Sequence, residues 1–366
     1  MNRLNILLSL YLSFCPYMIL YGQKMDISST VVGKVTCIAR LTGMPLPEEE
    51  FMSPNSTVQQ WNIGGTDLGI IWEQAPGKYG IFFGDSYGRN FKPFGPKPND
   101  AAGEWRCNFL AFSTDTYLND GLSFSGVVTD NKGEAREIIP GGKDKSGKGD
   151  WTSIPTAAIR AGGIDYVHYF NMRNWRNWDT NYSALYRSVD SGMSWEPCAN
   201  VKFSSDSYFG QIGYFKKDGY VYMIGTETGR DTPARLARFR ERDIERQERY
   251  EYWDGTINKW VRGDEKRATV IIDDKVGELS FIYNYKYKKW IIAYFASARY
   301  DITLRMADDI TGPWSEPYKL VDSKEYPQLY GSFYHPLSSY GDELYFLMSM
   351  WKPYNVFLMK TVLFKK

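Results

Sequence analysis

Short apolar runs separated by turn residues recur along this chain, and one pair of runs is especially clear. Thr66 to Trp72 and Tyr79 to Gly84 flank the segment Ala75-Pro76-Gly77-Lys78. Proline presets φ for a turn and glycine supplies a positive φ, so the pattern predicts a β-hairpin. Each half of this hairpin carries one aspartate beside glycines, Asp67 in GGTDLG and Asp85 in FGDSYG.

The two aspartates admit two interpretations. A carboxyl group in an apolar strand is costly unless a charged or hydrogen-bonding group meets it, and neighbouring glycines let a ligand approach the backbone closely. Asp67 and Asp85 therefore indicate the floor of a pocket. The alternative is that each aspartate closes a turn by bonding its own backbone. The residues alone leave both interpretations open.

The hairpin is the first copy of a pattern in which an inner strand leads to a turn, an apolar strand and a third strand. Four more copies follow: Ile154–Ile159, Tyr166–Phe170 and Ser183–Ser188; Phe209–Phe215, Tyr220–Thr226 and Ala234–Phe239; Gly277–Tyr283, Trp290–Phe295 and Ile302–Met306; Gly331–Pro336, Leu344–Met348 and Val356–Lys360. Five copies predict an all-β chain folded as a five-bladed β-propeller. We expect Asn355 to Phe364 to share a blade with a strand from 26–45 and so close the ring.

Other segments complete this prediction. Glu104 to Ser113 is expected to be one strand with Arg106 and Asn108 on the same face. Composition predicts a loop at 46–60 and a mobile surface loop at 131–150. The arginine-rich run 235–249 has a helical composition, but a solvated face after a strand is the better interpretation.

Two segments resemble Asp-box turns, in which an aspartate closes a tight hairpin above a tryptophan. Ser188 to Trp195 matches the pattern closely and Ala307 to Trp314 matches it loosely. Such boxes lie at the outer edge of propeller blades. We interpret both as structural.

The N-terminus has the features of a cleaved export signal. Arg3 gives a positive start, an apolar run follows to Leu20, and Gly22 is a small residue before Gln23. We therefore expect a signal peptide at 1–22, an exported protein, and one propeller domain over 23–366. The apolar run is too interrupted for a membrane span. A lipid anchor on Cys15 is the alternative.

Composition narrows the function classes. The 44 Lys and Arg residues nearly balance the 43 Asp and Glu residues, leaving a formal charge of +1, so no nucleic-acid partner is expected. Aromatic residues make up 16% of the chain, which suits both a β-rich core and the stacking of rings on sugars.

After signal cleavage three cysteines remain: Cys37, Cys107 and Cys198. Their spacing is not that of a zinc site, so no metal and no cofactor are expected. One disulfide plus a free thiol, or three buried thiols, are both possible from the sequence. A calcium ion in the channel stays open as an alternative, and we expect a monomer.

In a small propeller the innermost strands line a central channel, where ligands bind at one mouth. The expected inner strands carry Asp67, Thr156, Gln211, Glu278 and Tyr334. Facing carboxyl groups are what glycoside hydrolysis needs, one to protonate the leaving oxygen and one to activate water or attack the anomeric carbon. The candidate catalytic residues are thus Asp67, Asp85 and Glu278.

The candidates for holding hydroxyl groups and ring faces come from other segments. They are Arg106, Asn108, Trp175, Arg230, Trp253 and Trp351. For each aromatic residue, packing in the core is the alternative.

Nine stretches together resemble the bacterial family known as domain of unknown function 4185, which includes the endo-D-arabinanases of glycoside hydrolase family 183. They are GGTDLGI, GKYGIFFGDSYG, RCNFLAFSTD, IPTAAI, GYVYMIGTETGR, YEYWDG, GELSFIYN, GPWSEP and LYFLMSMWKPYNVFLMK. They follow one another in order, and the resemblance extends from about residue 35 to the C-terminus. The resemblance implies a five-bladed propeller whose catalytic aspartates are Asp67 and Asp85.

The activity that this resemblance implies is internal cleavage of D-arabinofuranose chains, as in mycobacterial arabinogalactan and lipoarabinomannan. The loops 86–104 and 171–182 are expected to set the substrate. A non-catalytic carbohydrate-binding propeller is one alternative. A hydrolase on another sugar is a further one, although the arginine triad and tyrosine–glutamate pair of a sialidase cannot be assigned. Aspartates on neighbouring strands permit retention or inversion, and we slightly favour inversion.

Overall fold

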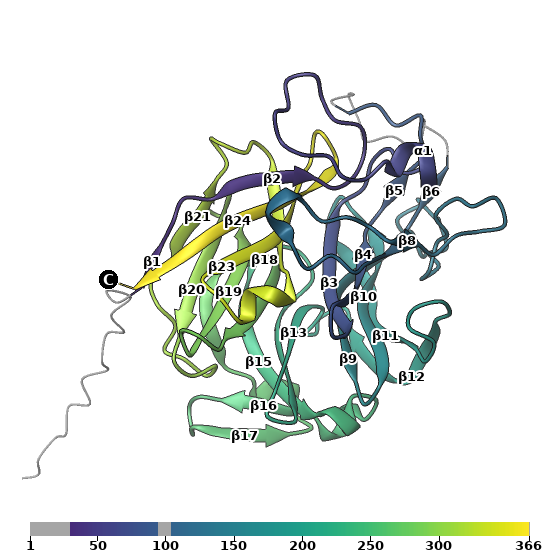
Figure 1. Cartoon of the computed structure of the whole chain (residues 1–366). Helices are drawn as coiled ribbons and strands as arrows, with labels where there is room; N and C mark the ends of the chain where they lie inside the picture. Colours follow the sequence, from purple (N-terminus) through teal and green to yellow (C-terminus); the bar gives the residue numbers. More distant parts are fainter. Residues whose placement is uncertain (1–29, 94–103, 366) are drawn as a thin grey trace, which may run out of the picture.

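The computed structural model describes residues 30–93 and 104–365, and these ranges are almost entirely β-structure (Figure 1). The α-helix in them is the five-residue α1, Thr57–Trp61. Short 3-10 turns complete the connections: η3 Leu118–Asp120, η4 Glu241–Asp243, η5 Gln247–Arg249, η6 Glu265–Arg267 and η7 Pro336–Ser339. The all-β prediction is confirmed. The expected signal segment 1–22, with Cys15, and the start at Gln23 lie outside the described residues.

The first sheet contains the predicted hairpin. Its strands in order are β3 Leu68–Ala75, β4 Lys78–Phe83, β7 Phe109–Ser113 and β8 Gly126–Val127. The first strand begins at Leu68 rather than at Thr66, because Leu68 and Gly69 have positive φ angles of 70° and 96° and the pairing with β4 shifts register there. Asp67 thus precedes β3 directly, and Asp85 follows β4.

The second sheet has four long strands. They are β9 Thr152–Ala161, β10 Ile164–Asn174, β11 Asp179–Ser188 and β12 Glu196–Ser204, each paired with the next. The first Asp-box turn joins β11 to β12. Asp190 Oδ1 accepts from the Ser194 amide at 2.9 Å, and the Trp195 ring packs at 5.1 Å from that of Phe82. The turn is thus held by Asp190 and packed through Trp195, so the box has a structural role, as predicted.

A larger sheet follows, in which β15 pairs with β18. Its strands are β13 Gln211–Lys217, β14 Tyr220–Thr226, β15 Thr232–Arg240, β16 Glu251–Asp254, β17 Lys259–Arg262, β18 Val270–Asn284, β19 Lys289–Ala296, β20 Asp301–Ala307 and β21 Tyr318–Asp322. The run 235–249 continues β15 and then forms η4 and η5, so no α-helix occurs there. At the second Asp-box turn, Asp309 Oδ1 accepts from the Thr311 amide at 2.9 Å.

The last sheet joins the two ends of the described chain. It contains β22 Leu329–Tyr334, β23 Glu343–Met350, β24 Asn355–Lys365, β1 Thr30–Val32 and β2 Thr36–Arg40. Both N-terminal strands pair with β24, and Figure 1 shows the purple β1 and β2 beside the yellow β24. The predicted sharing of a sheet by the N-terminal and C-terminal strands is confirmed.

The inner strands β3, β9, β13, β18 and β22 surround a common centre. Each contacts the next in this order, and β22 contacts β3 again. The sheets extend outward from them in a propeller-like arrangement (Figure 1). The apolar core lies between neighbouring sheets, where fully buried rings such as Phe82 and Phe295 are found. The fold thereby brings residues of all five inner strands to one central cavity.

The segment Glu104–Ser113 is not one strand, which corrects the prediction. Trp105–Arg106 forms β6 and pairs with β5, Ser86–Tyr87, while β7 starts at Phe109 in another sheet. Arg106 and Asn108 therefore do not share a face. The loop 131–150 is anchored by the buried Ile139.

The three cysteines in the described ranges are free thiols. Cys107 and Cys198 are buried and Cys37 is partly buried. Burial raises the pKa of each thiol to about 12. Among the helices of the described ranges, none is long and apolar enough to cross a membrane.

Candidate active site

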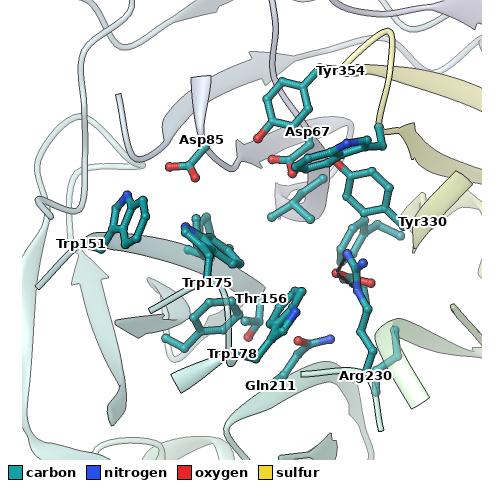
Figure 2. Close-up of a pocket in the computed structure, with 18 of the residues that line it drawn as sticks. Asp67, Asp85, Trp151, Thr156, Trp175, Trp178, Gln211, Arg230, Tyr330 and Tyr354 are labelled. Carbon is teal, nitrogen blue, oxygen red and sulfur yellow. Dashed lines mark hydrogen bonds and ion pairs between the residues drawn. The ribbon is translucent and has the colours of Figure 1, made fainter. Parts of the chain in front are cut away.

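A cavity of about 530 Å³ opens at the centre of the ring (Figure 2). All five inner strands contribute to its lining, through residues such as Leu68, Thr156, Gln211, Glu278 and Tyr330. Leu68 and Gln211 begin their strands, whereas Thr156 and Glu278 lie further along β9 and β18. Side chains that are far apart in the sequence thus meet in one space.

Asp67 lies in this cavity against two tyrosines. The Tyr330 hydroxyl donates to its Oδ2 at 2.8 Å, and its Oδ1 is buried with no hydrogen-bond partner in the described part of the chain. Burial and the neighbouring Asp85 charge raise the pKa of Asp67 to about 8, while the hydroxyls of Tyr330 and Tyr354 lower it in part. At neutral pH Asp67 therefore carries a proton that it can donate.

The backbone around Asp67 is shaped for this position. Leu68 is held at its positive φ of 70° while its amide donates to Ser349 Oγ at 2.8 Å. A Cβ atom at Gly84 would overlap Oδ1 of Asp67. Glycine is thus required at position 84 so that the carboxyl group can pack against the opposite strand.

Asp85 has a different environment. Its side chain is buried, and its Oδ1 accepts from Trp105 Nε1 at 2.9 Å and from Thr152 Oγ1 at 2.7 Å. Two donors on one oxygen favour a carboxylate over a carboxylic acid. The open end of one hairpin thus holds two carboxyl groups in different environments: burial favours the protonated form of Asp67, whereas Asp85 meets two hydrogen-bond donors.

Glu278 is held by Arg230. Its Oε1 accepts from Arg230 Nε at 3.1 Å and from Nη2 at 2.6 Å, while Oε2 is buried with no hydrogen-bond partner among the described residues. Burial alone would lower the pKa of Arg230, but the Glu278 carboxylate raises it above its ordinary value. Arg230 also lies 4.9 Å from the ring centre of Trp178 and 5.1 Å from that of Tyr330.

Aromatic side chains form most of the remaining wall. Trp175 and Trp178 meet edge to face at 5.1 Å, and Figure 2 shows both rings in the cavity together with Trp151. Trp351 meets the rings of Tyr330 and Tyr354 edge to face and keeps 49% of its surface exposed. Exposed or cavity-facing rings of this kind can stack on the apolar faces of sugars.

The structure brings most of the sequence candidates together. Asp67, Asp85, Glu278, Trp175, Arg230 and Trp351 all line the cavity, as do Thr156 and Gln211 from the inner-strand set. Four other residues that the sequence analysis singled out do not line it. They are Arg106, Asn108, Trp253 and Tyr334.

Those four residues make other contacts. Arg106 is 3.6 Å from Glu134 in an ion pair. Asn108 is fully buried and bonds only backbone groups, including the Ile139 amide and carbonyl. Trp253 of β16 packs on Trp260 of β17, its partner in the nine-stranded sheet.

Tyr334 is the last residue of β22. It lines a second cavity of about 240 Å³ together with Tyr214 and Tyr340.

Sequence reasoning missed several residues of the site. Tyr330 and Tyr354 contact Asp67, and Trp105 and Thr152 hold Asp85. All four are ordinary strand or turn residues with no motif of their own. Trp105 stands near the predicted Arg106, but only the pairing of β5 with β6 directs its indole toward Asp85.

No group of three or more His, Cys, Asp or Glu side chains in the described ranges is arranged to hold a metal ion. The carboxyl groups of the cavity meet tyrosine, tryptophan, threonine and arginine instead.

Comparison with known proteins shows relatives in fungi. The chain is 27% identical over 315 residues to notoamide biosynthesis cluster protein J of Aspergillus sp. (strain MF297-2), covering 80% of this chain and 81% of that protein. It is 26% identical to notoamide biosynthesis cluster protein J' of Aspergillus versicolor, covering 80% and 82%.

Solved structures show the same fold at low identity. A putative hydrolase from Bacteroides ovatus ATCC 8483 is 14% identical with a TM-score of 0.56, covering 83% of this chain and 87% of that one. An exo-β-1,3-galactanase from Phanerochaete chrysosporium is 10% identical with a TM-score of 0.50, covering 84% and 62%. A family model matches residues 52–360, and the chain therefore belongs to the family described as domain of unknown function DUF4185.

Proposed function

We propose that this protein is a glycoside hydrolase that cleaves internal α-D-arabinofuranosyl linkages of D-arabinan, as found in mycobacterial arabinogalactan and lipoarabinomannan. The observation that carries the proposal is the pair Asp67 and Asp85 in one aromatic-lined cavity with opposite environments. Glycoside hydrolysis needs one protonated and one ionised carboxyl group beside the scissile bond. The D-arabinan substrate rests on the sequence motifs around these two residues.

In this proposal Asp67 is the general acid. Its pKa of about 8 keeps it protonated at neutral pH, and its buried Oδ1 has no competing partner in the described chain. It would protonate the glycosidic oxygen as the bond to the anomeric carbon breaks. Asp85 would act as the carboxylate that activates water for inversion or attacks the anomeric carbon for retention.

The fold comparisons support a glycosidase in general terms. The exo-β-1,3-galactanase of similar fold acts on a galactan, and it shares only 10% identity with this chain. A second candidate function is carbohydrate binding without cleavage. The aromatic wall of Trp175, Trp178 and Trp351 favours it equally, since sugar stacking alone needs no proton transfer.

The two functions are separated by Asp67→Asn and Asp85→Asn, each assayed by release of reducing ends from a panel of D- and L-arabinans. Asparagine keeps the size but cannot transfer a proton, and the loss is expected to be ~10²–10⁴-fold or more. Glu278→Gln tests whether the third carboxyl group takes part. Asp120→Asn, at an exposed position, is the control.

Wild-type activity together with two inactive aspartate variants would support the hydrolase. Binding of arabinan by a wild type that releases no reducing ends would show the binding function instead. Near wild-type rates in both aspartate variants, with an inactive Glu278→Gln, would move the chemistry to Glu278.

We also propose five blades. The arrangement that supports this count is the ring of five inner strands, with the nine-stranded sheet divided between β15 and β18. A crystal structure with a different number of blades would contradict it.

We also propose that the protein is exported and that its signal peptide is cleaved after Gly22. A lipid on Cys15 is the alternative. The proposed chain acts as a monomer. Intact mass of secreted protein checks the first point, and light scattering checks the second.

A further inference from the structure

Gln211 has a buried side-chain amide with no hydrogen-bond partner among the described residues. It is the first residue of β13 and keeps only 2% of its surface exposed. Neither its amide nitrogen nor its amide oxygen has a hydrogen-bond partner in the described ranges. Figure 2 shows the amide at the lower side of the cavity, between Trp178 and Arg230. A buried polar group without a partner destabilises a fold, so its presence in a cavity indicates a ligand.

Glu278, on the adjoining inner strand β18, has a second polar atom, Oε2, without a hydrogen-bond partner in the described ranges. Arg230 occupies Oε1 with two hydrogen bonds and thereby leaves Oε2 as a fixed acceptor. The strands β13 and β18 contact each other, and a Cβ atom at Gly213 would lie 2.8 Å from Leu279 Cδ1. Gln211 and Glu278 both line the cavity, and their strands lie against each other.

We propose that Gln211 and Glu278 together bind adjacent hydroxyl groups of an uncharged sugar ring. The proposal rests on the function proposed above and names the subsite that selects its substrate. A sugar hydroxyl both donates and accepts, so neighbouring hydroxyls can satisfy the donor and acceptor of Gln211 and the acceptor Oε2 of Glu278. Arg230 is then a positioning residue that orients Glu278.

The charged side chains that line the cavity disfavour the binding of acidic sugars. Among its described lining residues the one cation is Arg230, and that guanidinium is already paired with Glu278. The carboxyl groups of Asp67 and Asp85 share the same space. A uronate, sialate or phosphate substituent would thus enter without a free positive partner and beside acidic groups, which disfavours it.

The test uses Gln211→Leu, made in an Asp85→Asn chain so that the ligand is not consumed. Binding is measured by calorimetry with neutral oligosaccharides of arabinan, galactan and xylan, and with galacturonate oligomers and sialyllactose. We expect neutral ligands alone to bind, and the leucine variant to bind them ~10-fold or more weakly because two hydrogen bonds are lost. Its melting temperature should be unchanged or higher, since no protein partner is lost.

Gln74→Leu is the matched control. Gln74 is also buried, but its Nε2 donates to Asp165 Oδ2 and to the Ser191 carbonyl, each at 3.0 Å, and it does not line this cavity. Its replacement should lower the melting temperature and leave sugar affinity unchanged. The two glutamines are thus expected to give opposite results.

Unchanged affinity in Gln211→Leu, or a fall in its melting temperature like that of Gln74→Leu, would overturn the proposal and assign Gln211 to the fold. Binding of acidic sugars alone, or of no sugar in the panel, would overturn it as well. Neutral sugars that bind through Gln211 to a wild type unable to cleave them would support this subsite while rejecting the hydrolase.

Discussion

The hydroxyl group of Tyr330 donates a hydrogen bond of 2.8 Å to Oδ2 of Asp67, although 263 residues separate the two in sequence. The contact between β22 and β3 closes the ring of inner strands and brings the last sheet against the first, which makes this bond possible. The bond stabilises the ionised form of Asp67 and so opposes the burial that raises its pKa to about 8.

Tyr330→Phe is therefore predicted to raise the pKa of Asp67 further. If Asp67 is the acid, the alkaline limb of kcat/KM should move to higher pH, because the proton is then lost later. The pH profile on a cleaved arabinan measures this, and a carbon NMR titration of the Asp67 carboxyl group measures it without substrate. Tyr300→Phe, at a partly exposed lining position, should leave the profile unchanged. A limb that moves to lower pH would contradict the assignment.

Gly84→Ala should lower activity by ~10²-fold and keep the fold. The added methyl group would overlap Oδ1 of Asp67 and displace the carboxyl group. A displacement of about 1 Å in a catalytic group can cost ~10²-fold in rate. Gly126→Ala is the control, because a Cβ atom there has no neighbour within 4 Å. Full activity in Gly84→Ala would show that the position of Asp67 does not matter for turnover.

The stability of the protein should depend on pH through Asp67. Because the pKa of Asp67 is raised from 3.8 to about 8 in the fold, the folded state binds a proton that the unfolded state has lost between these values. This contribution to stability is present at low pH and is lost as pH rises through about 8.

Asp67→Asn removes that dependence, so the variant should gain stability relative to wild type between pH 5 and pH 9. Urea unfolding at several pH values measures the difference. A difference that does not change with pH would contradict the raised pKa. Asp120→Asn, at an exposed position, serves as the reference.

Asn108 should contribute strongly to the stability of the fold. Its side chain donates to the Ile139 and Ser153 carbonyls at 2.8 and 2.9 Å, and accepts from the Ile138 and Ile139 amides at 3.1 and 2.9 Å. Asn108→Leu leaves these buried backbone groups unpaired, at ~1–3 kcal/mol for each group that finds no new partner.

Denaturant unfolding should therefore show that Asn108→Leu loses several times as much free energy of unfolding as Asn131→Leu. Asn131→Leu changes an exposed position. Wild-type stability with weakened sugar binding would instead support the role in substrate binding that the sequence suggested.

The sequence by itself determined the local structure and the key pair of the site. Alternating apolar runs and Pro-Gly turns specify strands, because side-chain direction repeats every two residues. The hairpin of β3 and β4, the Asp-box turn at Asp190 and the pairing of β24 with the N-terminal strands were predictable in this way. The glycines beside Asp67 and Asp85 indicated a pocket for the same local reason.

Only the tertiary structure decided what surrounds these aspartates. Asp67 receives a donor from β22, and Asp85 receives donors from β6 and β9. These three donors lie 263, 20 and 67 residues away in sequence. Arg106 and Asn108 looked alike as alternating polar residues, but the strand breaks between them and β7 begins only at Phe109. Arg106 therefore pairs with Glu134, whereas Asn108 is buried and bonds backbone groups. Burial and long-range partners set the pKa of a carboxyl group, and both arise only when the ring of strands closes.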